Sequence, residues 1–109
     1  MGLSKNELFT DQQNDIARLA KAFSHPARVA ILEYLFKSKT CICNDLIDEI
    51  GLAQPTISQH LKELKNCGLI KGVIEGTRIC YCINDDNWTS KKILLLQFLN
   101  QTSHNTDCC

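Results

Sequence analysis

NDLIDEIGLAQPTISQHLKELKNCGLIK, residues 44–71, is the stretch that decides the fold. Its first part places Leu46, Ile47 and Ile50 at the i, i+1, i+4 spacing of one helix face, with acidic side chains turned outward. Gly51 follows the last apolar residue, and glycine is favoured just after a helix C-terminus. The pattern predicts a short amphipathic helix that ends at Gly51.

The second part predicts another helix, with an apolar stripe of Ile57, Leu61 and Leu64 at spacings of four and three. Its opposite face has no net negative charge and is rich in side chains that suit base edges and phosphates. Two helices joined by a glycine-containing turn, the second with such a face, are typical of a helix-turn-helix that binds double-stranded DNA. Two ordinary amphipathic helices with a solvated polar face are the alternative interpretation. The candidate DNA-binding residues here and in the following hairpin are Gln54, Thr56, Ser58, Gln59, His60, Lys62 and Arg78.

Two β-rich runs follow, at residues 69–74 and 78–83, and residues 75–77 form the turn between them. A helix-turn-helix followed by a β-hairpin is a winged helix. Arg78 lies at the tip of the predicted hairpin, where a guanidinium group suits a phosphate or a narrow minor groove.

Upstream, residues 11–23 predict a helix. Ser24 is expected to cap the next helix, with Pro26 in its first turn. Residues 40–43 alternate in polarity and predict a very short strand. The helix that follows Ser24 and precedes this strand is expected to form central core. Its apolar residues are Val29, Ile31, Leu32, Tyr34, Leu35 and Phe36.

Asp85 or Asp86 is expected to cap a last helix, residues 85–100, which is apolar over more of its surface than one stripe needs. Exposed apolar surface of this kind favours a homodimer interface, shared here with residues 11–23. Burial within its own domain is the alternative. The fold class is therefore mainly α with a small β-hairpin, a dimeric winged helix in the order α-α-β-α-α-β-β-α. Residues 1–109 form one domain, with flexible tails at residues 1–10 and 101–109.

The composition limits what the chain can do. Its formal net charge is +0, so DNA affinity must come from a local patch, and residues 54–78 hold four cations against two anions. No apolar run has membrane-spanning length and no signal peptide is visible, which predicts a cytoplasmic protein without membrane contact. Seven cysteines in a reducing compartment are typical of metal ligands or redox switches.

Residues 14–100 resemble the ArsR/SmtB family of winged-helix repressors. The resemblance is carried by SHPAR at residues 24–28, TCICNDL at 40–46, QPTISQHL at 54–61 and GLI at 68–70. It implies a homodimer that binds operator DNA and leaves it when an inducer binds.

The resemblance also implies a sensor position. Arsenic- and cadmium-sensing members carry a Cys-x-Cys where Cys41 and Cys43 stand here. Arsenic-type members often add a third cysteine where this chain has Leu46. Zinc-sensing members use Asp and His on the last helix, and residues 84–100 contain no His.

Cys80 and Cys82 form a second Cys-x-Cys, in the second predicted hairpin strand, and period two puts both on one face. In winged helices the short strand before the helix-turn-helix pairs with this strand, and cross-strand β-carbons are about 4.5–5.5 Å apart. Cys41 and Cys43 would then complete a four-thiol cluster. Such thiolates suit As(III) or Sb(III) by three sulfurs, or Cd(II), Pb(II) or Zn(II) by four. Cys108 and Cys109, on the C-terminal tail, are the rival ligands.

The sequence thus predicts a repressor of a metal or metalloid resistance operon, released when arsenite or a related soft ion binds cysteine thiolates. A thiol redox-switch regulator and a cadmium, lead or zinc sensor of the same fold are the alternatives, and a winged helix used only for protein interaction is a further one. An enzyme is not expected. The chain has no Ser/His/Asp pattern, no phosphate-binding glycine loop and no Cys-x-x-Cys.

Overall fold

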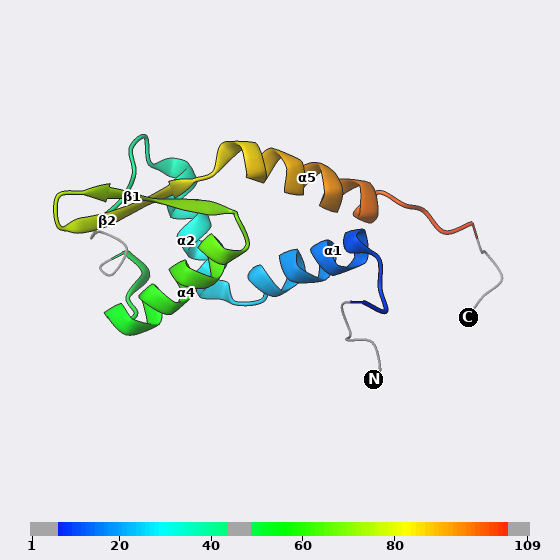
Figure 1. Cartoon of the computed structure of the whole chain (residues 1–109), viewed down its shortest axis with the longest axis horizontal. Helices are drawn as coiled ribbons and strands as arrows, with labels where there is room; N and C mark the ends of the chain where they lie inside the picture. The colour runs from blue at the N-terminus through cyan, green and yellow to red at the C-terminus, as the bar shows by residue number, and fades with distance from the viewer. Residues whose placement is uncertain (1–6, 44–48, 105–109) are drawn as a thin grey trace.

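The computed structural model describes residues 7–43 and 49–104 of the chain. Figure 1 shows the β-hairpin at one end of the molecule, while the first and last helices extend side by side toward the other. Within the described residues, no helix is long and apolar enough to cross a membrane. In chain order the elements are α1 (Asp11–Ala22), α2 (Pro26–Lys37), α4 (Gln54–Asn66), β1 (Ile70–Glu75), β2 (Arg78–Ile83) and α5 (Asp85–Leu99).

The apolar stripe predicted for the second helix of the motif is confirmed as its buried face. Ile57, Leu61 and Leu64 of α4 are all 5% exposed or less, and they pack in one core with α2 and the hairpin. This burial orients α4, because a helix with one apolar stripe must turn its polar side outward. The other members of the core are Leu19, Ala22, Ile31, Leu32, Leu35, Leu69, Ile70 and Ile83.

The predicted hairpin is confirmed. β1 and β2 pair antiparallel, from Ile70 opposite Ile83 to Glu75 opposite Arg78. Gly76 lies in the turn between them with φ of +63°, a left-handed conformation that glycine adopts without steric cost.

The strand predicted at residues 40–43 is reduced to a single bridge. Ile42 and Tyr81 exchange two backbone hydrogen bonds, of 2.9 and 2.8 Å. The pairing at residues 40–43 does not extend beyond this bridge. The bridge nevertheless attaches the segment before the helix-turn-helix to β2, which is the pairing that the sequence predicted.

Two predicted helix caps are wrong. His25 precedes α2 without a side-chain cap, because the Ser24 hydroxyl instead donates to the Lys21 carbonyl, 2.6 Å away, at the end of α1. Asn84 caps α5, its Oδ1 accepting from the Asn87 amide at 3.4 Å. Asp85 and Asp86 lie in the first turn, where the positive end of the helix dipole stabilises their negative charges.

The expectation that the apolar residues of α2 form central core is also wrong in part. Val29 is 38% exposed and Phe36 is 50% exposed, since α2 is covered on one side only. The Phe36 ring packs edge-on against Trp88 of α5, with ring centroids 4.7 Å apart.

The first helix of the predicted motif lies mostly outside the described residues. Glu49 and Ile50 are helical, and Gly51 has φ of +82°. Glycine therefore ends this helix in the left-handed conformation that the sequence favoured.

Candidate functional site

The polar face of α4 is open to solvent. The helix begins at Gln54 with Pro55 in its first turn, and Ala53 before it offers no side-chain cap. The side chain of Gln59 donates to Glu63 Oε1, 3.2 Å away. Five of the predicted DNA-binding residues of α4 are exposed: Gln54, Thr56, Ser58, Gln59 and Lys62.

His60 differs from these residues because its ring turns toward α2. Nδ1 accepts a hydrogen bond of 3.1 Å from Nε of Arg28, which is itself only 7% exposed. The His25 ring lies 5.4 Å away between centroids. Burial, and then the charges of Arg28 and His25, lower the pKa of His60. His60 therefore joins α4 to α2, and a DNA contact by it stays a prediction.

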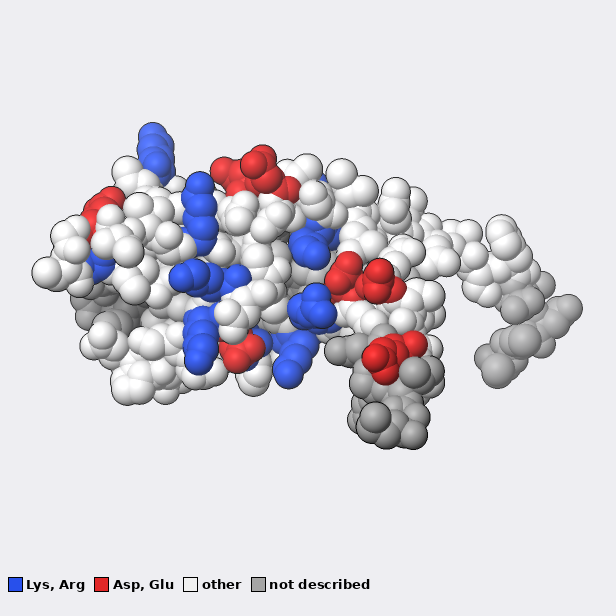
Figure 2. All heavy atoms as spheres, viewed as in Figure 1, with Lys and Arg blue, Asp and Glu red and all other residues white. Residues whose placement is uncertain are grey.

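The hairpin supplies further cations. Arg78 is exposed at the start of β2, and Lys65 and Lys71 are exposed on α4 and β1. Figure 2 shows Lys and Arg side chains gathered over the part of the molecule where Figure 1 places α4 and the base of the hairpin. This arrangement suits a polyanion even though the net charge is +0.

The Ile42–Tyr81 bridge arranges four cysteines as two cross-strand pairs. Cys43 forms a disulfide with Cys80, with Cα atoms 4.0 Å apart, and Cys41 forms a hydrogen bond with Cys82. We call these four residues the cysteine ladder.

The two pairs of the ladder have different surroundings. Cys41 and Cys82 line a cavity of about 330 Å³ together with Lys71 and Asp85. Burial, and then the hydrogen bond to Cys41, raise the pKa of the Cys82 thiol to about 11. In the disulfide pair, Cys80 is fully buried and Cys43 is half-buried.

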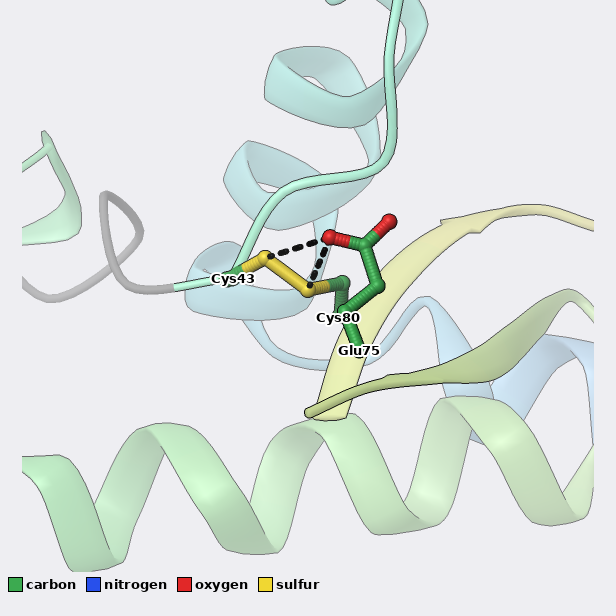
Figure 3. The surroundings of a disulfide bond; sticks show 3 residues. All are labelled: Cys43, Glu75 and Cys80. Atoms are coloured by element: carbon green, nitrogen blue, oxygen red, sulfur yellow. Dashed lines mark hydrogen bonds between the residues drawn. A yellow bond between two sulfur atoms is a disulfide. The ribbon is translucent and has the colours of Figure 1, made fainter. Parts of the chain in front are cut away.

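Glu75, which the sequence prediction missed, lies beside the disulfide (Figure 3). Its Oε2 is 3.6 Å from Cys80 Sγ and 4.0 Å from Cys43 Sγ. The hairpin register could have predicted this contact. Val73 pairs with Cys80, and Glu75, two residues further along β1, projects from the same face of the hairpin as Val73 and Cys80.

The two Cys-x-Cys pairs face each other as the sequence predicted, and the binding of one ion by all four sulfurs stays a prediction. Cys43, Cys80 and Glu75 have donor atoms within 4.8 Å of one another, and no sulfur of the other pair joins them. Cys67 is half-buried against the core. The rival ligands Cys108 and Cys109 lie outside the described residues.

Comparisons with known proteins agree on one family. The family described as bacterial regulatory protein, arsR family, matches residues 25–71. An uncharacterized HTH-type transcriptional regulator, MJ1325 of Methanocaldococcus jannaschii, is 45% identical over 64% of this chain and 79% of its own. A cadmium resistance transcriptional regulatory protein, the CadC homolog of Staphylococcus aureus, is 32% identical over 90% of this chain and 79% of its own.

A solved structure agrees with the fold. The cadmium metal-sensor CMTR of Mycobacterium tuberculosis superposes with a TM-score of 0.55 at 29% identity, over 85% of this chain and 96% of its own. This likeness covers a larger share of the chain than the family match at residues 25–71.

Proposed function

Because the chain belongs to the ArsR family of bacterial regulatory proteins, which are DNA-binding transcriptional regulators and not enzymes, we propose that it is a metal-responsive repressor. It binds operator DNA as a homodimer in the cytoplasm and leaves it when a soft ion binds the cysteine ladder. The inducing ion is As(III) or Sb(III), and the alternatives are Cd(II), Pb(II) and Zn(II).

The observation that carries this proposal is the position of the ladder. The Ile42–Tyr81 bridge joins the segment that leads into the helix-turn-helix to the strand that carries Arg78. An ion that draws these sulfurs together acts on both candidate DNA-binding elements at once. The relatives' names, a cadmium resistance regulator and a cadmium sensor, support a soft ion as the inducer.

The linkage must satisfy thermodynamics. An ion shifts the DNA-bound equilibrium only by its differential affinity for the two states, so the DNA-bound form must hold the ladder in a poorer geometry for the ion. A coupling of about 1–3 kcal/mol is usual for such linkage. Since thiolates are the ligands, ion uptake should release protons and weaken at low pH.

The test uses three double variants, C41S/C43S, C80S/C82S and C108S/C109S, each bound to labelled operator selected from random-sequence DNA. Arsenite and cadmium are titrated under a phosphine reductant, which keeps all thiols reduced. We expect the first two variants to stay on DNA at ion concentrations that release wild type. Cys67→Ser is the matched control, because Cys67 is a half-buried cysteine outside the ladder. Release of C41S/C43S and C80S/C82S as readily as wild type would contradict metal sensing by the ladder.

A second candidate function, a thiol redox switch, is favoured by the Cys43–Cys80 disulfide. In that case an oxidant alone would release wild type, and C80S/C82S would not respond to it. Release by oxidant but by neither ion would replace the metal-sensing proposal with this one.

A further inference from the structure

Glu75 brings a third donor to the Cys43–Cys80 pair, and the three donors come from three separate segments. Cys43 lies just before the helix-turn-helix, Glu75 ends β1, and Cys80 is in β2. Across the described residues 7–43 and 49–104, no other three His, Cys, Asp or Glu side chains bring donor atoms this close together. Cys80 is fully buried and Glu75 is exposed, so the group is closed on the protein side and open to solvent on the other.

The spacing of these donors fits a tetrahedral cation. Zinc bonds of about 2.3 Å to sulfur and about 2.1 Å to oxygen, at tetrahedral angles, place the sulfur and oxygen ligands about 3.6 Å apart. The observed distances from Glu75 Oε2 to the two sulfurs are 3.6 and 4.0 Å. Only the two sulfurs, now joined to each other, would have to separate.

We propose that, once reduced, Cys43 and Cys80 bind a divalent thiophilic cation of the zinc and cadmium class together with Glu75, with water in the fourth position. The inference rests on the proposed metal-sensing function and narrows its ligand. Carboxylate oxygen is an ordinary ligand of zinc, whereas trivalent arsenic takes three sulfurs. Glu75 therefore selects a divalent cation over arsenite at this pair.

The chemistry balances in two steps. A dithiol reductant supplies two electrons and two protons, which break the Cys43–Cys80 bond and give two thiols. The dication then displaces both thiol protons and binds the two thiolates. Two positive charges arrive as two protons leave, so the net charge of the site, set by Glu75, stays the same.

It follows that the cation acts on DNA binding through position and not through charge. Glu75 stands opposite Arg78 across the Gly76 turn. A cation held by Glu75 and Cys43 ties the wing tip to the segment that enters the helix-turn-helix. In the disulfide form that segment is bonded to Cys80, and Glu75 only contacts the two sulfurs.

The test measures cation affinity of the reduced protein, without DNA, by competition with a zinc chelator and by thiolate-to-cadmium absorption. Loss of even an outer-shell partner costs metal affinity about 10–100-fold, so Glu75→Gln should weaken zinc and cadmium binding by at least about 10-fold. Arsenite affinity should not change. Glu33→Gln, which removes the same charge from the exposed side of α2, is the matched control and should bind like wild type.

The outcomes separate this inference from the function on which it rests. Wild-type cadmium affinity in Glu75→Gln, with affinity lost in C43S/C80S, would remove Glu75 from the site and leave metal sensing intact. Equal weakening of arsenite and cadmium by Glu75→Gln would overturn the selectivity. Wild-type affinity in C43S/C80S itself would overturn the inference and count against the proposed function as well.

Discussion

At the scale of single residues, the His60–Arg28 contact connects protonation to the position of α4. Nδ1 of His60 accepts from Arg28 Nε, so it must carry no proton in this arrangement. Protonation would remove the acceptor and bring a cation against the buried Arg28. The contact between α4 and α2 therefore depends on a neutral imidazole.

This dependence predicts how stability varies with pH. The pKa of His60 is lowered from 6.5 in the folded protein, so the unfolded chain binds more protons. Stability from His60 is present above pH 6.5 and is lost as pH falls through the folded pKa. His60→Gln keeps an acceptor but does not titrate, and its free energy of unfolding should fall less steeply than that of wild type as pH drops below 6.5.

Urea denaturation followed by circular dichroism at a series of pH values measures the effect. His104→Gln, at an exposed position after α5, should keep the wild-type slope. A wild-type slope in His60→Gln would show that the Arg28 contact does not control this titration.

At the scale of elements, α4 and the hairpin present two kinds of candidate DNA contact. Gln59 carries an amide that can read a base edge once it leaves Glu63, and Arg78 carries a charge on the wing. The amide selects sequence, whereas the charge mainly contributes affinity, because phosphates are the same at every base pair.

Substitutions of Gln59 and Arg78 should therefore change DNA binding in different ways. Gln59→Ala should cost about 1–3 kcal/mol on the selected operator and relax base preference there. Arg78→Ala should weaken all sequences alike and lower the slope of log K against log salt by about one. Fluorescence anisotropy at several salt concentrations measures both effects.

Lys92→Ala, an exposed cation on α5, is the control for the loss of one charge. Should Arg78→Ala keep the wild-type salt slope, or Gln59→Ala keep full sequence preference, the corresponding element does not contact DNA as proposed.

At the scale of the whole molecule, α1 and α5 form a layer whose apolar surface is incompletely covered. None of the residues of α5 is buried. Four of its large apolar side chains are about half exposed or more: Ile93, Leu96, Phe98 and Leu99. A second copy of the chain would cover this surface and set the spacing of two recognition helices, as expected for half-sites about 10–10.5 bp apart or a multiple of it.

Leu99→Glu places a charge on the most exposed of these positions, where it disturbs the monomer least. We expect it to shift the protein from dimer toward monomer at micromolar concentration in sedimentation velocity. Gln97→Glu adds the same charge to α5 without removing an apolar side chain, and it should remain dimeric. A wild-type chain that sediments as a monomer at this concentration would contradict the homodimer.

The sequence by itself determined the elements that depend on local spacing. The stripe of Ile57, Leu61 and Leu64 follows helical periodicity, and the strands of the hairpin follow β-propensity and a glycine turn. These signals lie within one element, so they can be read without knowing what the element packs against. The pairing of residues 40–43 with β2 was also predictable, because the fold that these elements imply contains it.

Tertiary structure alone decided how side chains from distant segments meet. The hydrogen bonds between Ile42 and Tyr81 determine which cysteines face each other, and they join segments 39 residues apart in the chain. Whether His60 faces DNA or Arg28 depends on how α4 rotates over α2, and the reach of Glu75 to the sulfurs depends on how the wing packs over Cys43. Periodicity assigns a residue to a face of its own element, but the partner across that face is set by packing between elements.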